Sequence, residues 1–116
     1  MYSIFLDNVK IGTTMFENRD SSMGVVFGKI NLIKEEFNYD YIKKYCLENN
    51  VQLTFDDPSE KLIATRNIPK LKIFNKLNIE ITNKSGCNIE GMDKEGFQVT
   101  ILGIPYSFFE KEFYIK

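Results

Sequence analysis

The sequence predicts an α+β domain with an antiparallel-rich sheet of about six or seven strands and two helices packed on one face. Three observations indicate this class. Several short segments alternate apolar and polar residues, as strands with one buried face do. Turn-forming residues separate these segments at short intervals, which favours antiparallel neighbours. Only two stretches, one central and one near the end, show the helical spacing of apolar residues.

The first segment predicts a hairpin and then a long strand. Residues 2–6 and 9–13 alternate in polarity, and Asp7-Asn8 between them is typical of a tight turn. After a polar loop, residues 24–33 are rich in Val, Ile and Phe. We expect one strand there, bent at Gly28, because glycine weakens regular pairing and permits a change of direction.

The next segment predicts the first helix. Asn38 is a favoured N-cap residue, and Asp40 lies in the first turn, where the helix dipole stabilises a negative charge. Asn49-Asn50 ends the helix. The apolar residues of this segment recur at helical spacing and define one face, formed by Tyr41, Ile42, Tyr45 and Cys46.

The segments after this helix predict further strands. Residues 51–55 and 61–65 flank the turn-forming run Asp56-Asp57-Pro58-Ser59, so we expect them to pair as a hairpin. Residues 71–74 and 77–81 also alternate in polarity. The second of these, with Leu, Ile and Ile on one side, is the clearer half-buried strand.

The last part of the chain predicts one strong strand and a short helix. Residues 84–96 are rich in turn formers, and we expect only brief pairing there, over 89–92. Residues 97–101 alternate and predict the last strand. Pro105 then opens a helix, because its missing N–H costs nothing in a first helical turn. The apolar face of this helix comprises Tyr106, Phe109 and Phe113.

Length and composition predict a single domain over residues 1–116. With 43% apolar and 14% aromatic residues, the chain can form one core without a disulfide or a metal. It contains 0 His, which excludes Ser-His and Cys-His nucleophiles and His-ligated metals. No apolar run approaches the roughly 20 residues of a membrane span, and the start lacks a basic segment, so we expect a cytoplasmic protein.

The two cysteines, Cys46 and Cys87, lie far apart in the sequence. Cys46 falls on the apolar side of the predicted helix, where a thiol acts as a small hydrophobic group. Cys87 follows Ser85-Gly86 in a predicted turn. Two cysteines do not make the dense pattern of a secreted scaffold, so we expect free thiols rather than a disulfide.

The run Gly24–Ile30 has some likeness to a phosphate-binding loop. Only three residues separate Gly24 from Gly28, whereas that loop needs four, and Ile30 replaces its metal-binding hydroxyl. The intervening residues favour a strand over the required helix start. We interpret the glycines as positions of close backbone approach, and we predict no catalytic residues, no metal and no cofactor.

Acidic residues in the predicted loops and turns are the candidate partner-binding residues. Turn chemistry and solvation account for most carboxylates in such positions. Exposed carboxylates can also complement a basic protein surface and accelerate association. The residues that we expect to contact a partner are Glu17, Asp20, Asp56, Asp57 and Glu60.

Two other functions stay open on the residues alone. Paired carboxylates and tyrosines could serve a small enzyme or a ligand-binding domain. Lys70, Lys72 and Lys76, interleaved with Phe74, could contact single-stranded nucleic acid, although a net charge of −1 disfavours phosphate binding. The same residues also suit an exposed edge strand that lysines protect from self-association.

Two short stretches resemble segments of small bacterial proteins of this size class, most of them functionally uncharacterised: Met23-Gly24-Val25-Val26-Phe27-Gly28 and Leu102-Gly103-Ile104-Pro105-Tyr106. The patterns Asp7-Asn8-x-x-Ile11-Gly12 and Glu17-x-x-Asp20 are also similar. The resemblance implies a bacterial origin and a compact α+β fold, and it implies no catalytic residues. By analogy, such proteins are similar to immunity proteins, which bind and block one toxin.

The sequence therefore predicts a non-enzymatic protein-binding domain, most concretely an immunity-type inhibitor of a bacterial toxin. The expected partner is a protein, such as a cognate toxin, rather than a membrane or a nucleic acid. The chain has 6 Tyr, a residue type enriched at protein interfaces.

Overall fold

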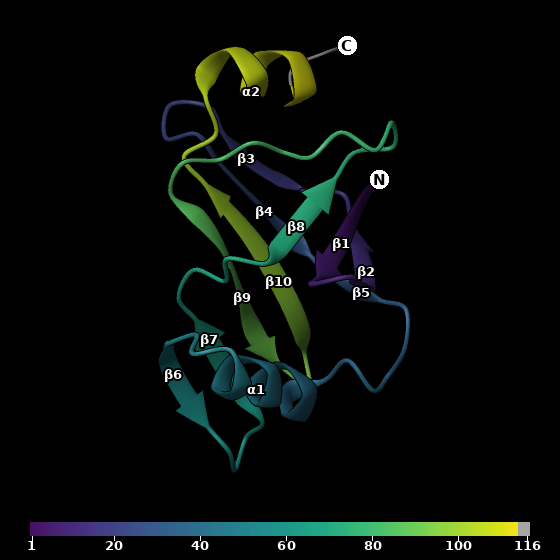
Figure 1. Cartoon of the computed structure of the whole chain (residues 1–116), viewed down its shortest axis with the longest axis vertical. Helices are drawn as coiled ribbons and strands as arrows, with labels where there is room; N and C mark the ends of the chain where they lie inside the picture. Colours follow the sequence, from purple (N-terminus) through teal and green to yellow (C-terminus); the bar gives the residue numbers. More distant parts are fainter. Residues whose placement is uncertain (114–116) are drawn as a thin grey trace.

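The α+β class is confirmed, but the strands form two sheets rather than one. The computed structural model describes residues 1–113, which form two helices and ten strands in two antiparallel sheets (Figure 1). The predicted packing of both helices on one face is wrong. In Figure 1, α1 (Tyr39–Glu48) and α2 (Tyr106–Phe113) lie at opposite ends of a molecule that measures 42 × 24 × 24 Å.

The four-stranded sheet contains the predicted first hairpin, which is confirmed. β1 (Tyr2–Leu6) pairs antiparallel with β2 (Val9–Thr14), and Asp7 in the turn has a φ of 59°. Asp tolerates this left-handed conformation better than most residues do. The spatial order of the sheet is β5-β2-β1-β8, with β5 at Asn31–Leu32 and β8 at Leu71–Phe74.

The six-stranded sheet has two long strands at its centre and short strands at both edges. The predicted last strand and the second hairpin are confirmed, whereas β3 lies inside the segment predicted as a polar loop. Every second residue of β10 is buried, so one face of the sheet packs on the core and the other is open. In spatial order the strands are β3 (Asn18–Asp20), β4 (Val25–Lys29), β10 (Gly96–Leu102), β9 (Gly86–Met92), β7 (Leu62–Thr65) and β6 (Leu53–Asp57).

The long strand predicted over 24–33 is divided between the two sheets. β4 pairs with β10 in the six-stranded sheet, and β5 pairs with β2 in the four-stranded sheet. Ile30 lies between them, is 3% exposed and donates its backbone N–H to Phe97 at 2.8 Å. The change of direction therefore falls at Ile30 and not at Gly28, because the chain crosses there from one sheet to the other.

β9 is longer than the brief pairing predicted over 89–92. It runs for seven residues and pairs with both β10 and β7. Cys87 and Ile89 point into the core, while Asn88 and Glu90 lie on the open face. The sequence did not predict the full strand, because Gly86, Asn88 and Gly91 are residue types typical of turns. The strand tolerates the polar residue Asn88, because it projects from the open face of the sheet.

The half-buried strand predicted over 77–81 is wrong. Only an isolated bridge between Phe74 and Glu80 forms in this segment. The side-chain oxygen of Asn75 accepts hydrogen bonds from the N–H groups of Leu77 at 2.8 Å and Ile79 at 3.0 Å. Because these donors are bound locally, they cannot enter a sheet ladder. Leu77 is 71% exposed and Ile79 is 49% exposed, whereas Ile81 is buried.

The predicted ends of α1 are confirmed. The Asn38 side chain accepts a hydrogen bond from the Tyr41 N–H at 3.2 Å, and the helix ends at Asn49, followed by Asn50 with a φ of 58°. Its fully buried residues are Tyr39, Ile42 and Cys46.

α2 begins after Pro105 as predicted, and it closes the other end of the core. Tyr106, expected on its buried face, is instead 69% exposed, because it lies one turn before the residues that reach the core. The Phe113 ring lies 5.6 Å from the Tyr2 ring and 6.0 Å from the Phe16 ring. These aromatic contacts connect α2 to β1 and to the loop before β3.

Candidate functional site

The five candidate acids do not form one patch. Glu17 and Asp20 lie at the β3 edge of the six-stranded sheet, whereas Asp56, Asp57 and Glu60 lie at the β6 edge and its turn. Four strands separate β3 from β6, which places the two edges about 24 Å apart at the usual interstrand spacing. The acids therefore belong to two separate surfaces.

Glu17 and Asp20 bind backbone groups near their own positions. A Glu17 carboxylate oxygen accepts a hydrogen bond from the Lys29 N–H at 3.1 Å. Asp20 Oδ1 accepts from the Ser22 hydroxyl at 2.7 Å and from the Ser22 N–H at 3.1 Å. The Ser22 hydroxyl is the largest influence that holds the pKa of the Asp20 carboxyl below its ordinary value. Asp20 thus shapes the loop that leads into β4, and Glu17 binds the last residue of β4.

Gly24 and Gly28 are confirmed as positions of close backbone approach. A Cβ on Gly28 would lie 2.5 Å from Thr14 Oγ1 and 2.8 Å from the Phe16 Cα. A Cβ on Gly24, which has a φ of 65°, would lie 2.7 Å from the Ile104 carbonyl oxygen. The glycines therefore allow neighbouring segments of the chain to pack closely against them. Gly28 lies within a strand, whereas a phosphate-binding loop precedes a helix.

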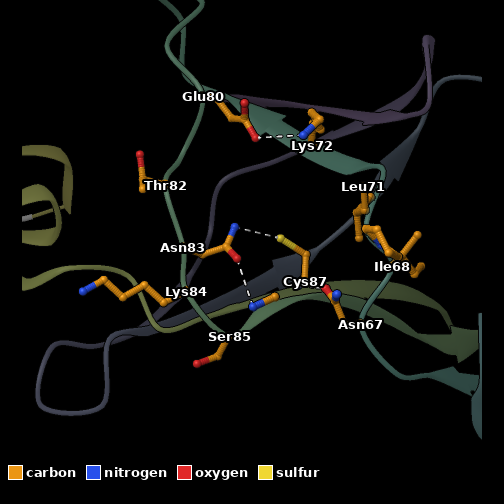
Figure 2. A pocket seen from close by; sticks show the side chains of 12 residues that line it. Asn67, Ile68, Leu71, Lys72, Glu80, Thr82, Asn83, Lys84, Ser85 and Cys87 are labelled. Carbon is orange, nitrogen blue, oxygen red and sulfur yellow. Dashed lines mark hydrogen bonds and ion pairs between the residues drawn. The ribbon is translucent and has the colours of Figure 1, made fainter.

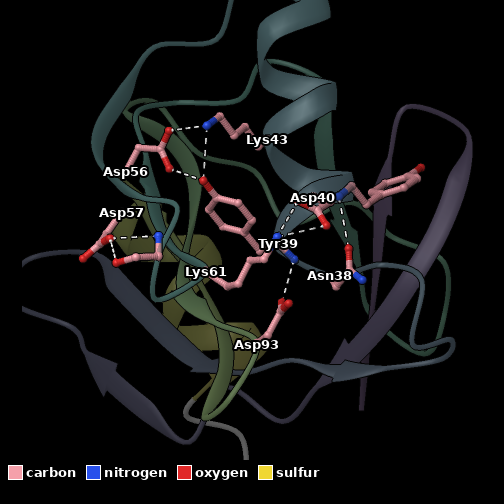
Figure 3. A network of polar contacts seen from close by, with 10 residues as sticks. Asn38, Tyr39, Asp40, Lys43, Asp56, Asp57, Lys61 and Asp93 are labelled. Atoms are coloured by element: carbon pink, nitrogen blue, oxygen red, sulfur yellow. Dashed lines mark hydrogen bonds and ion pairs between the residues drawn. The ribbon is translucent and has the colours of Figure 1, made fainter.

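A polar network connects α1 to the β6–β7 hairpin (Figure 3). The Tyr39 hydroxyl donates to Asp56 Oδ1, and Lys43 Nζ lies 2.8 Å from Asp56 Oδ2. Lys43, and secondly Tyr39, hold the pKa of the Asp56 carboxyl below its ordinary value. Burial, followed by the bond to Asp56, raises the pKa of Tyr39. At neutral pH Asp56 is therefore charged, and Lys43 compensates its charge.

Tyr39, which is 2% exposed, is the residue at which three elements meet. Lys61 Nζ and Lys43 Nζ lie 5.3 and 5.6 Å from the centre of its ring, within the range of cation–π attraction. Its backbone N–H donates to Asp93 Oδ1 at 2.7 Å, and Lys61 pairs with Asp40 at 3.2 Å. Sequence reasoning missed Tyr39, because these contacts depend on how a helix start, a hairpin and the β9–β10 turn are aligned.

The solvent side of the hairpin carries an aromatic ring and carboxylates. Phe55 is 53% exposed on the edge strand β6. Asp57 Oδ1 accepts from the Ser59 hydroxyl at 2.7 Å, and Glu60 is exposed. Within residues 1–113 neither Asp57 nor Glu60 forms an ion pair. We call Phe55, Asp57 and Glu60 the acidic hairpin surface.

The charges of the chain are divided along the molecule. Residues 34–61 and 93–95, which meet around Tyr39, contain nine carboxylates and five lysines. The rest of the sequence contains seven carboxylates and ten Lys or Arg. The net charge of −1 is therefore the sum of an acidic region at the α1 end of the molecule and a basic region formed by the rest of the sequence. Separated charges of this kind steer the association of charged partners.

A pocket of about 460 Å³ lies between β8, the start of β9 and the segment that joins them (Figure 2). Cys87 lines it, and Asn83 donates to the sulfur at 3.4 Å. Burial raises the pKa of this thiol to about 12, so the sulfur is protonated and weakly nucleophilic at neutral pH. Glu80 is the one carboxylate among the lining residues, and it pairs with Lys72 at 3.4 Å. The pocket thus offers no pair of carboxylates for acid–base chemistry.

No three carboxylates or thiols within residues 1–113 gather closely enough to hold a metal ion. The described helices are too short to cross a membrane.

Comparison of the chain with protein-family models, with curated proteins and with solved structures found no match. The function is therefore inferred from the surfaces of the molecule itself.

Proposed function

We propose that the protein is a non-enzymatic protein-binding domain, and specifically an immunity-type inhibitor that binds a bacterial toxin through the acidic hairpin surface. One observation carries the proposal. The exposed ring of Phe55 stands on the same hairpin as Asp57 and Glu60, two carboxylates that form no ion pair within residues 1–113. Exposed aromatic rings are common binding anchors, and the surrounding charges set specificity and speed.

The rigidity of the hairpin supports this role. The Tyr39–Asp56–Lys43 network fastens it to α1, and Lys61 connects it to Asp40. A surface that is already ordered loses little conformational entropy when a partner binds. The pairing of β6 with β7 is irregular between Leu53 and Phe55, which discourages the addition of another strand. The partner would therefore contact side chains rather than extend the sheet.

The charge of the surface favours one class of toxin. Enzymes that act on nucleic acids bind phosphates with Lys and Arg, so their active sites are basic. An acidic inhibitor complements such a site and reaches it quickly. The analogy with immunity proteins, which bind and block one toxin, is consistent with this class of partner. We therefore expect a nuclease toxin as the partner.

Co-expression with the product of the neighbouring reading frame, followed by affinity capture, tests the proposal. We expect a stable complex whose association rate falls as the salt concentration rises, because exposed charges are screened. Absence of a complex with either neighbouring product would overturn the proposal.

A matched pair of variants tests the surface. Asp57→Asn with Glu60→Gln should weaken capture, because both substitutions remove charge from the hairpin. Glu17→Gln with Asp20→Asn removes the same charge at the opposite sheet edge and should leave capture unchanged. If the second pair weakens capture and the first does not, the binding surface lies at β3 and the assignment to the hairpin is wrong.

A further inference from the structure

The outer face of the four-stranded sheet combines aromatic rings with lysines. The register places Phe5 of β1 directly opposite Lys10 of β2 on one side and Lys72 of β8 on the other. Residues opposite one another in antiparallel strands project from the same face. Their neighbours Ile4, Leu6 and Ile73 point into the core, so Phe5 and its two lysines project outward.

A groove of about 650 Å³ runs along this face. The rings of Phe5 and Phe74 line it, with centres 5.6 Å apart and planes at 89° to each other. Both rings are half-buried, so each has a fixed position and an accessible part. Lys70 and Lys72 also line the groove. Lys76 does not, because the chain leaves β8 after Phe74 and turns at Asn75.

The two lysines that line the groove form only weak ion pairs within the protein, so a ligand can replace their carboxylate partners. Lys70 lies 3.7 Å from Asp7, and Lys72 lies 3.4 Å from Glu80. The side chains in these pairs are between 39% and 69% exposed, so water and salt weaken the pairs. A phosphate could replace either carboxylate. The face also belongs to the basic part of the sequence, which the net charge of −1 conceals.

We propose that this groove binds single-stranded nucleic acid, with a base against the rings of Phe5 and Phe74 and phosphates at Lys70 and Lys72. A third phosphate would lie outside the groove at Lys10, which projects from the same sheet face opposite Phe5. Aromatic side chains on an open sheet face are suited to unpaired bases, because every base has a flat face to stack. A duplex hides those faces, so the groove discriminates against paired strands. The proposal is independent of the proposed function, since it concerns the other sheet.

Fluorescence anisotropy with a labelled single-stranded oligothymidylate of about 15 nucleotides tests the proposal. We expect saturable binding at low salt, with log affinity falling against log salt with a slope of about −2, as three phosphate contacts on a single strand require. A duplex of the same length should bind at least about fivefold more weakly, since the loss of one stacked base has an effect of this size.

Two matched pairs of variants locate the site. Lys72→Gln and Phe74→Leu should each weaken binding by about fivefold or more. Their controls, Lys29→Gln and Phe55→Leu, make the same changes on the six-stranded sheet and should leave the affinity unchanged. Circular dichroism confirms that each variant is folded.

Three results would overturn the proposal: no anisotropy change at low salt, equal affinity for the duplex, or equal effects of the control variants. The neutralised hairpin variant, Asp57→Asn with Glu60→Gln, separates the two proposals. It should lose the protein partner and keep the oligonucleotide, so failure of one function leaves the other separately measurable.

Discussion

Lys43 Nζ and Asp56 Oδ2 lie 2.8 Å apart and connect the first helix to the acidic hairpin. The contact shows that Asp56, a predicted partner-binding residue beside Asp57, also binds two side chains within the protein. The two adjacent acids have different surroundings, since Asp56 faces α1 and Asp57 caps a turn toward solvent.

Asp56→Asn should destabilise the fold, because the amide cannot form the ion pair with Lys43. We expect the free energy of unfolding, measured in urea, to fall by about 1 kcal/mol at neutral pH. Asp57→Asn is the matched control, and its effect should stay within about 0.5 kcal/mol. Equal effects of the two substitutions would show that the network does not stabilise the hairpin.

The effect of Asp56→Asn should also depend on pH. Lys43 and Tyr39 lower the pKa of Asp56 in the folded protein. The carboxylate therefore contributes stability above its unfolded pKa, about 4, and this contribution is lost as the pH falls through the lower folded value. Urea unfolding should show a constant difference between the two proteins near neutral pH, and a shrinking one below about pH 4.

Both thiols should resist modification in the folded protein. Cys46 and Cys87 are free and buried, and burial raises their pKa to about 11 and about 12. Because the thiolate is the reactive form, a disulfide reagent at about pH 8 should label the native protein slowly. In denaturant, both thiols should react at once. Rapid labelling of the native protein would contradict the burial of these side chains.

Gly28→Ala should destabilise the protein, because its methyl group would meet Thr14 Oγ1 and backbone of Phe16. Overpacking of this kind costs about 1–3 kcal/mol, which corresponds to a decrease of several degrees in Tm. Lys29→Ala, at the exposed neighbouring position, is the control and should have little effect. An unchanged Tm for Gly28→Ala would contradict this prediction and show that Thr14 and Phe16 shift to accommodate the added methyl group.

Arg19→Lys should loosen α2. The Arg19 guanidinium donates to the carbonyl oxygens of Phe16 and Phe113, both at 2.9 Å, and lies 5.2 Å from the centre of the Phe113 ring. A lysine ammonium cannot reproduce this planar arrangement. We expect a loss of about 1 kcal/mol in the free energy of unfolding and faster amide hydrogen exchange in α2. Exchange that is faster throughout the chain would instead indicate global destabilisation.

The features predicted correctly are those that depend on near neighbours. Asn38 caps α1 and Asp7 turns the first hairpin, because each acts on backbone groups within a few residues. The prediction of a strand over 77–81 was wrong for a related reason. Its alternation suits a strand, but Asn75 binds its N–H groups first, and hydropathy does not report that competition.

The candidate surfaces were less predictable, because they depend on alignment between distant segments. Asp57 and Glu60 are near each other in sequence, so their shared surface could be predicted. The row formed by Lys10, Phe5 and Lys72 requires the register of three strands. Its members come from the two strands of the first hairpin and from β8, and no pattern within one segment aligns them.

The contact between the first strand and the last helix affects how the chain folds as it is synthesised. The Tyr2 hydroxyl donates to Glu112 at 2.9 Å, across 110 positions of sequence. While the ribosome is still making β10, the ring of Tyr2 lacks its neighbour Phe113. β4 also lacks its pairing with β10 at this stage. The rings of Tyr2 and Phe16 therefore lack the cover of Phe113 until α2 emerges, and we expect a chaperone to protect the nascent chain during this interval.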